Sequence, residues 1–167
     1  MDEGQGDSGR VGEGEVDGRQ AETGGGGEVA ERGGEVAAGR RVLVIEDDAH
    51  IKDLLTDVLT GDGFAVTGAD SVLGAAALVR RLRPCAIVLD LGLPYRSGAS
   101  LLTDLKADPE TAGIPVIVVS ALPETLTPER RALATAVLAK PISIRDLLRA
   151  VHAVCPDVAQ SPGSPFN

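Results

Sequence analysis

The stretch VLVIEDDAH, residues 42–50, decides the fold of this chain. Its four leading apolar residues have the pattern of a strand buried in a sheet. They run directly into three consecutive carboxylates, Glu46, Asp47 and Asp48. At about 4 Å and an effective dielectric constant of about 20, each pair of like charges costs roughly 4 kcal/mol. The stretch therefore predicts a buried strand whose acidic end faces a ligand of opposite charge.

The same apolar pattern returns along the chain and alternates with helical patterns. Residues 86–89 and 116–119 are further near-continuous apolar runs, and 64–66 and 137–139 are shorter candidates. Apolar residues at helical spacing lie between and after these runs. The predicted helices cover residues 51–59, 72–82, 101–105, 128–136 and 143–151. Five βα units in this order predict an α/β fold, with a five-stranded parallel sheet covered by helices on both faces.

The first and last of these helices have well-defined apolar faces and N-caps. Asp48 precedes the first helix, and Ser143 with Asp146 forms a capping box at the start of the last. The predicted core positions are Ile51, Leu54, Leu55, Val58 and Leu59 in the first helix and Ile144, Leu147, Leu148 and Val151 in the last.

Polar residues end four of the predicted strands. Glu46 and Asp47 end the first, Asp90 ends the third (IVLDLGLP), Ser120 the fourth (IVVSA) and Lys140 the fifth (LAKP). Because parallel strands end at the same edge of a sheet, these residues are expected to share one site. A strand-end serine or lysine alone is usually a cap or a surface charge. The combination of carboxylates, a hydroxyl and an ammonium group indicates function.

This set of groups suits phosphoryl transfer. Clustered carboxylates favour Mg²⁺, which prefers oxygen ligands and often binds one or two carboxylates together with water and phosphate oxygens. A carboxylate beside that ion can attack phosphorus and form an acyl phosphate. The transfer needs positioning and positive charge near the phosphoryl oxygens, which Mg²⁺ and Lys140 would supply. Ser120 would donate a hydrogen bond to the arriving phosphoryl group.

Residues 41–155 resemble the receiver domain of response regulators in two-component signalling. The resemblance is carried by VLVIEDD (42–48), IVLDLGLPYRSG (87–98), IPVIVVSA (114–121) and AKP (139–141). Pro94 and Gly98 stand four and eight residues after Asp90, as in the family. The resemblance implies a flavodoxin-like (βα)5 fold, a doubly wound sandwich with strand order 2-1-3-4-5.

The resemblance also implies a role for each strand-end residue. Asp90 corresponds to the phosphoacceptor and is itself a Mg²⁺ ligand. Asp47 corresponds to a direct ligand of Mg²⁺, Glu46 to an outer ligand through water, and Gly92 to a ligand through its backbone carbonyl. No other cofactor is implied.

Ser120 corresponds to the family's switch hydroxyl and Lys140 to its invariant lysine, whose bond to Pro141 is expected to be cis. The family usually has Tyr or Phe three residues before this lysine, where this chain has Val137. The span of twenty residues from Ser120 to Lys140 is also about two shorter than usual. Both departures put the family's hydroxyl–aromatic switching route in doubt. We also hypothesise that Gly92 leaves the phosphate open to water and shortens its lifetime.

Other readings of the same residues fit less well. The strand IVLD could be a Walker B strand, but the chain contains no G-x-x-x-x-G-K-[ST] motif. A haloacid-dehalogenase-type phosphatase would have a second Asp two residues after its nucleophile, where this chain has Gly92. A pseudo-receiver, acting as a protein-binding module without phosphorylation, would normally have lost Asp90, Lys140 or the acidic pair. The favoured prediction is a receiver that catalyses only its own phosphorylation and dephosphorylation. The pseudo-receiver stays as the alternative.

Composition divides the chain into three parts. Residues 1–40 contain thirteen glycines, ten acids and four bases, and repeat Gly-Glu-Val at 14–16, 27–29 and 34–36. This composition predicts a disordered acidic tail. Residues 41–155 form the predicted receiver domain, and residues 156–167 a flexible C-terminal tail. Residues 41–167 hold fifteen acids and twelve bases, which argues against direct binding of DNA.

The remaining expectations concern location and partners. Cys85 and Cys155 are predicted to be two free thiols in a reducing cytoplasm. No apolar stretch approaches the roughly 20 residues of a membrane span, so no membrane contact is expected. The resemblance implies a histidine kinase or a histidine phosphotransfer protein as the phosphodonor. The segment after Cys155 is too short for a DNA-binding output domain, so the predicted single-domain regulator acts on an unknown downstream protein.

Overall fold

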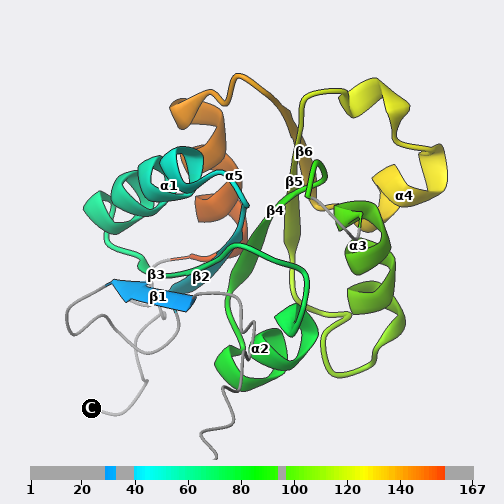
Figure 1. Cartoon of the computed structure of the whole chain (residues 1–167), viewed down its shortest axis with the longest axis horizontal. Coiled ribbons are helices and arrows are strands. Elements are labelled where there is room, and N and C mark those ends of the chain that lie inside the picture. The colour runs from blue at the N-terminus through cyan, green and yellow to red at the C-terminus, as the bar shows by residue number, and fades with distance from the viewer. Residues whose placement is uncertain (1–28, 33–39, 94–96, 157–167) are drawn as a thin grey trace, which may run out of the picture.

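The computed structural model describes residues 29–32, 40–93 and 97–156 of the chain (Figure 1). The strands are β1 (Val29–Arg32), β2 (Arg41–Ile45), β3 (Ala65–Ala69), β4 (Ala86–Asp90), β5 (Val116–Ser120) and β6 (Ala136–Ala139). The helices are α1 (Ala49–Gly61), α2 (Ala75–Leu82), α3 (Gly98–Ala107), α4 (Pro128–Leu133) and α5 (Ile144–Val154), with a 3₁₀ turn, η1, at Pro123–Thr125. None of these helices is long and apolar enough to cross a membrane.

The strands form one sheet in the order β1-β3-β2-β4-β5-β6. All neighbours from β3 to β6 pair in parallel, which confirms the predicted order 2-1-3-4-5 for the five parallel strands. The register places Ile45 beside Leu89, Asp90 beside Val119 and Ser120 beside Ala139. The carboxyl ends of β2, β4, β5 and β6 therefore lie along one edge of the sheet.

β1 is an addition to the predicted sheet. It pairs antiparallel with β3, from Val29 opposite Ala69 to Arg32 opposite Val66. The prediction of a disordered tail over residues 1–40 is therefore wrong for these four residues. The physical reason is the edge of β3, whose unpaired backbone groups can bind a strand of almost any sequence.

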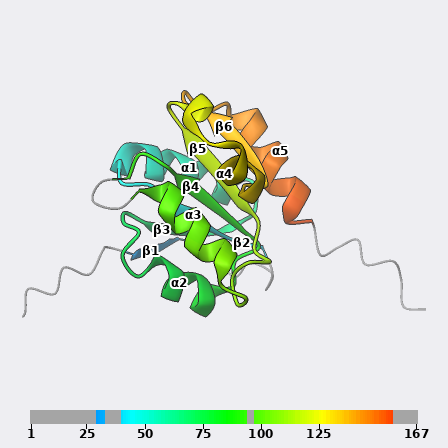
Figure 2. The ribbon, with the colours of Figure 1, turned by 90° about the vertical axis from the view of Figure 1, so that its right-hand side faces the viewer.

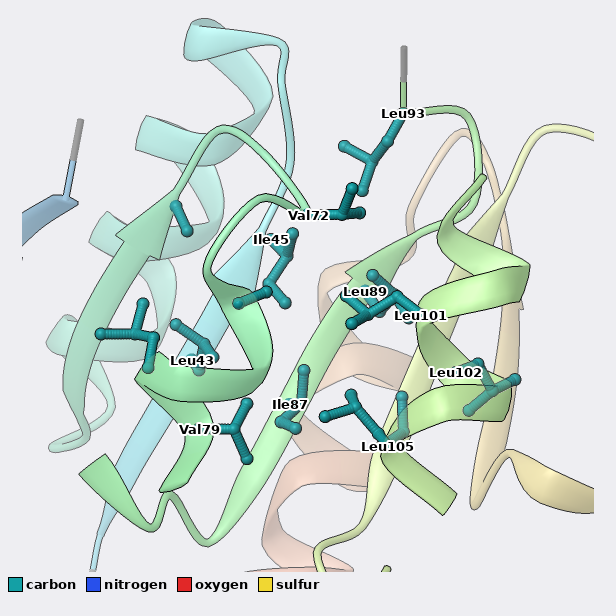
Figure 3. Close-up of a cluster of buried hydrophobic side chains, with 14 of the residues drawn as sticks. Leu43, Ile45, Val72, Val79, Ile87, Leu89, Leu93, Leu101, Leu102 and Leu105 are labelled. Carbon is teal, nitrogen blue, oxygen red and sulfur yellow. The ribbon is translucent and has the colours of Figure 1, made fainter. Parts of the chain in front are cut away.

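Two apolar clusters cover the two faces of the sheet. One lies between the sheet and helices α2 and α3, and its centre includes Leu43, Ile87 and Leu102 (Figure 3). The other lies beneath α1 and α5 and includes Phe64 and Leu147. Figures 1 and 2 show α1 and α5 together on one side and α2, α3 and α4 on the other. The prediction of helices on both faces is confirmed.

The predicted N-caps are confirmed, and the predicted core is partly wrong. Asp48 Oδ1 accepts hydrogen bonds from the N–H groups of His50 and Ile51, and Ser143 Oγ accepts one from Asp146. Leu54 and Ile144, however, are 54% and 48% exposed. The buried stripe of each helix is narrower than the apolar pattern in the sequence. Both stay on the surface.

The two cysteines form a disulfide bond, so the prediction of free thiols is wrong. Cys85 immediately precedes β4, and Cys155 is the C-cap of α5. Their Cα atoms lie 5.4 Å apart, within the range that a disulfide spans. A separation of 70 residues hides this proximity in the sequence, because it arises only when α5 packs against the sheet. The bond ties the end of the last helix to the start of the central strand.

Candidate functional site

Four strands bring the predicted site residues to one edge of the sheet. Glu46 and Asp47 follow β2, Asp90 ends β4 and Ser120 ends β5. Lys140 follows β6, where its backbone N–H donates a hydrogen bond to the carbonyl oxygen of Ser120 at 2.9 Å. The peptide bond after Lys140 is cis, as predicted.

The three carboxylates form a compact acidic group. One oxygen from each of Glu46, Asp47 and Asp90 lies within 4.8 Å of the others. Glu46 and Asp90 are buried, whereas Asp47 is exposed. A set of carboxylate oxygens that converge in this way, with one member open to solvent, fits a hard divalent cation.

Lys140 supplies positive charge beside two of the carboxylates. Its Nζ lies 3.0 Å from Glu46 Oε2 and 3.1 Å from Asp90 Oδ2. Burial acts to lower the pKa of Lys140, but the hydrogen bonds to Glu46 and Asp90, together with their charges, outweigh burial and raise this pKa above its ordinary value. Lys140 is therefore a permanent cation that offsets only part of the negative charge in the site.

Glu46 responds differently to the same contact. Burial raises the pKa of Glu46 above its ordinary value, the hydrogen bond from Lys140 opposes this rise, and the charge of Asp90 adds to it. The ion pair thus decides the direction of the pKa shift of Lys140, whose side chain is 22% exposed. Burial decides the direction of the pKa shift of Glu46, whose side chain is 2% exposed. Additional positive charge at this site would relieve the cost of keeping Glu46 ionised.

Gly92 holds the second oxygen of Asp90 and leaves space above it. Its backbone N–H donates to Asp90 Oδ1 at 3.0 Å. A Cβ atom at position 92 would lie 3.3 Å and 3.5 Å from the two carboxylate oxygens of Asp90. Because glycine lacks that atom, no side chain at this exposed position covers the carboxylate.

Gly98, the first residue of α3, is required by close packing against the backbone of Asp90. A Cβ atom there would lie 2.2 Å from the Asp90 carbonyl oxygen and 2.9 Å from Leu91 Cα. This contact gives a physical reason for a glycine eight residues after Asp90. Pro94, the other residue of that motif, lies outside the described residues.

Ser120 and Lys140 line a cleft next to Asp90. The cleft has a volume of about 490 Å³ and is also lined by Leu122, Thr125 and Arg130. Ser120 is buried, and its Oγ accepts a hydrogen bond from the N–H of Leu122 at 3.1 Å. That bond uses an acceptor site of the hydroxyl group and leaves its hydrogen able to point into the cleft.

Two further positions complete the description of the site. Arg130, on α4, was not among the predicted site residues, because the short segment around it shows only a Thr-Pro helix start and no strand end. Val137, which replaces the family's usual aromatic residue, is partly buried and packs against the apolar cluster shown in Figure 3.

Comparison with known proteins agrees with this arrangement. A family model for the response regulator receiver domain matches residues 42–152. Among curated relatives, the DNA-binding response regulator MtrA of Mycobacterium tuberculosis (strain ATCC 25618 / H37Rv) is 37% identical over 87 residues. The match includes 52% of this chain and 37% of MtrA, so it spans well under half the length of that relative.

Solved structures show the same fold. A CheY-like response regulator receiver domain from Methylobacillus flagellatus superposes with a TM-score of 0.64 at 26% identity, covering 69% of this chain and 98% of that one. The receiver domain of the sensor histidine kinase PA1611 from Pseudomonas aeruginosa PAO1 gives a TM-score of 0.62 at 25% identity, covering 71% of this chain and 99% of that one. That structure has a magnesium ion coordinated in its active site cleft. By its matched sequence and its fold, this chain belongs to the response regulator receiver domain family of two-component systems.

Proposed function

We propose that this receiver domain accepts a phosphoryl group on Asp90 from a histidine kinase or a histidine phosphotransfer protein. The observation that carries the proposal is the position of Asp90, whose carboxylate belongs to the acidic group and also has Oδ2 3.1 Å from Lys140 Nζ. Phosphorylation of Asp90 then changes the surface that the domain offers to a downstream protein. The domain is a signalling module, and its only chemistry is its own phosphorylation and dephosphorylation.

The acidic group is the proposed Mg²⁺ site. Asp47 and Asp90 would bind the ion directly, Glu46 through a water molecule and Gly92 through its backbone carbonyl. The bound ion supplies positive charge to the phosphoryl oxygens during transfer. The convergence of three carboxylate oxygens and the mixture of buried and exposed ligands support this assignment.

The residues of the chain position the reacting group. A carboxylate oxygen of Asp90 forms the new bond to phosphorus, while the bond from phosphorus to the donor's histidine nitrogen breaks and the histidine leaves. Lys140 and the N–H of Gly92 hold the carboxylate from two directions, which fixes its orientation before transfer. Ser120 donates its free hydroxyl hydrogen to the transferred group.

Phosphorylation shifts the domain between two arrangements that already exist in equilibrium. The phosphoryl group on Asp90 is a dianion, and its oxygens accept hydrogen bonds from both Ser120 and Lys140. We place this reaction in the cytoplasm, as is typical of the family, although the Cys85–Cys155 bond is unusual for that compartment. Direct DNA binding by this domain is not part of the proposal, because its charge is weakly negative overall.

Acetyl phosphate and intact mass spectrometry test the proposal. Wild-type protein with acetyl phosphate and Mg²⁺ is expected to gain the mass of one phosphoryl group. The Asp90→Asn variant, which keeps the shape of the side chain but loses the nucleophilic charge, is expected to gain none. Omission of Mg²⁺ should also prevent the gain. An unmodified wild-type protein would instead favour a protein-binding module that works without phosphorylation.

A further inference from the structure

The cleft beside Asp90 contains a second cationic residue. Arg130 of α4 lines it together with Asp90, Ser120 and Lys140. Lys140 is committed to Glu46 and Asp90 at 3.0 Å and 3.1 Å. The Arg130 guanidinium, in contrast, forms no ion pair with any residue in the described part of the chain. It is therefore a positive charge in the cleft that is not paired with any acidic residue of the described part of the chain.

Phosphorylation increases the need for that charge. The proposed Mg²⁺ and Lys140 together carry three positive charges, which only equal the three negative charges of Glu46, Asp47 and Asp90. A phosphoryl group replaces the one negative charge of Asp90 with about 1.5 to 2 and adds three strong acceptor oxygens. A guanidinium group can donate two parallel hydrogen bonds to such oxygens, which an ammonium group cannot do with the same geometry.

α4 is only weakly attached to the rest of the domain, so a new contact with the phosphoryl group can move it. The helix has six residues, and none of them is buried. Arg131, the neighbour of Arg130, does not line the cleft; its guanidinium donates to the carbonyl oxygen of Pro123 at 3.1 Å. Segments with little buried apolar surface change position at low cost in free energy.

We propose that Arg130 binds the phosphoryl group on Asp90 and that this contact moves α4. The inference rests on the proposed phosphorylation of Asp90. It gives the chain a switching route that does not need an aromatic residue at position 137, where Val137 packs into the core. α4 would be drawn toward the cleft by a charge on its own surface.

Nuclear magnetic resonance of the full chain tests the inference in four forms: wild type, Arg130→Ala, Arg130→Lys and Arg131→Ala. Each is treated with acetyl phosphate and Mg²⁺, and intact mass gives the phosphorylated fraction. Backbone amide shifts of residues 129–133, the part of α4 after Pro128, are then compared before and after phosphorylation within each form. Arg131→Ala is the matched control, because it removes the same charge from the same helix but not from the cleft.

We expect phosphorylation to move the amide signals of α4 in the wild type and in Arg131→Ala. In Arg130→Ala these changes should fall at least threefold although the protein is still phosphorylated, and Arg130→Lys should retain an intermediate change. Equal changes in the wild type and Arg130→Ala, at equal phosphorylated fraction, would overturn the role of Arg130 and leave the proposed function intact. A wild type that takes up no phosphoryl group would overturn both.

Discussion

Replacing Gly98 with alanine places a methyl group against the backbone that carries Asp90. The added Cβ would lie 2.2 Å from the Asp90 carbonyl oxygen, 2.9 Å from Leu91 Cα and 3.1 Å from the Asp90 carbonyl carbon. Real Cβ atoms essentially never approach another heavy atom closer than 3.0 Å, so the two backbones must separate by about 0.8 Å. No flexible side chain is available to absorb the displacement.

The cost follows from this displacement. Forcing an extra carbon into a well-packed place typically costs about 1–3 kcal/mol. Alanine at a helical position returns up to about 1 kcal/mol relative to glycine, so a net loss of about 1–2 kcal/mol in the free energy of unfolding is expected. Because a misplacement of about 1 Å can slow a positioned reaction by as much as about 10²-fold, phosphorylation of Asp90 should slow at least tenfold.

Gly61→Ala is the matched control. Gly61 is the last residue of α1, and a Cβ there would have no heavy atom within 4 Å. This variant should be as stable as the wild type or up to about 1 kcal/mol more stable, with unchanged phosphorylation. Urea denaturation measures the free energy of unfolding, and intact mass against time in acetyl phosphate measures the rate. If Gly98→Ala matches the wild type in both measurements, the packing argument is wrong.

Three further predictions concern the site and the disulfide. Lys140→Ala should keep Mg²⁺ binding, measured by calorimetry, but lose phosphoryl transfer or switching; unimpaired signalling would contradict its role. Gly92→Met should lengthen the lifetime of the phosphorylated protein severalfold, because a side chain would then cover the carboxylate. Mass spectrometry after removal of acetyl phosphate measures the loss of the phosphoryl group, and a loss as fast as in the wild type would contradict the idea. Reduction of the Cys85–Cys155 bond should lower the free energy of unfolding by about 4 kcal/mol, the chain-entropy value for a loop of about 70 residues. Identical urea transitions with and without reductant would contradict this stabilisation.

The sheet and the acidic group could be predicted because both depend on local patterns. A strand covered on two faces must be apolar throughout, so the first polar residue marks where the strand ends. Asp90 and Ser120 are such residues, and the parallel register brings their strand ends to the same edge. Once the strand order is known, the meeting of Glu46 with Lys140, 94 residues apart, needs no further information.

The features that were missed depend on neighbours that no local pattern reveals. β1 forms because the edge of β3 offers hydrogen-bonding groups, not because VAER favours a strand. The Cys85–Cys155 bond depends on where the end of α5 comes to lie. Arg130 reaches the cleft because α4 follows the loop after Ser120, and a single charged residue on a short helix has no signature in the sequence.

The strand β1 also has a practical consequence for how this domain should be produced. A shortened chain that begins at Arg41 would leave the outer backbone groups of Val66 to Ala69 without the partners that they have in the longer chain. Open sheet edges of this kind recruit other extended chains, whereas a short strand at the edge discourages them. Preparations intended for structural or signalling work should therefore retain the residues from Val29 onward, so that β1 covers the edge of β3 within the same molecule.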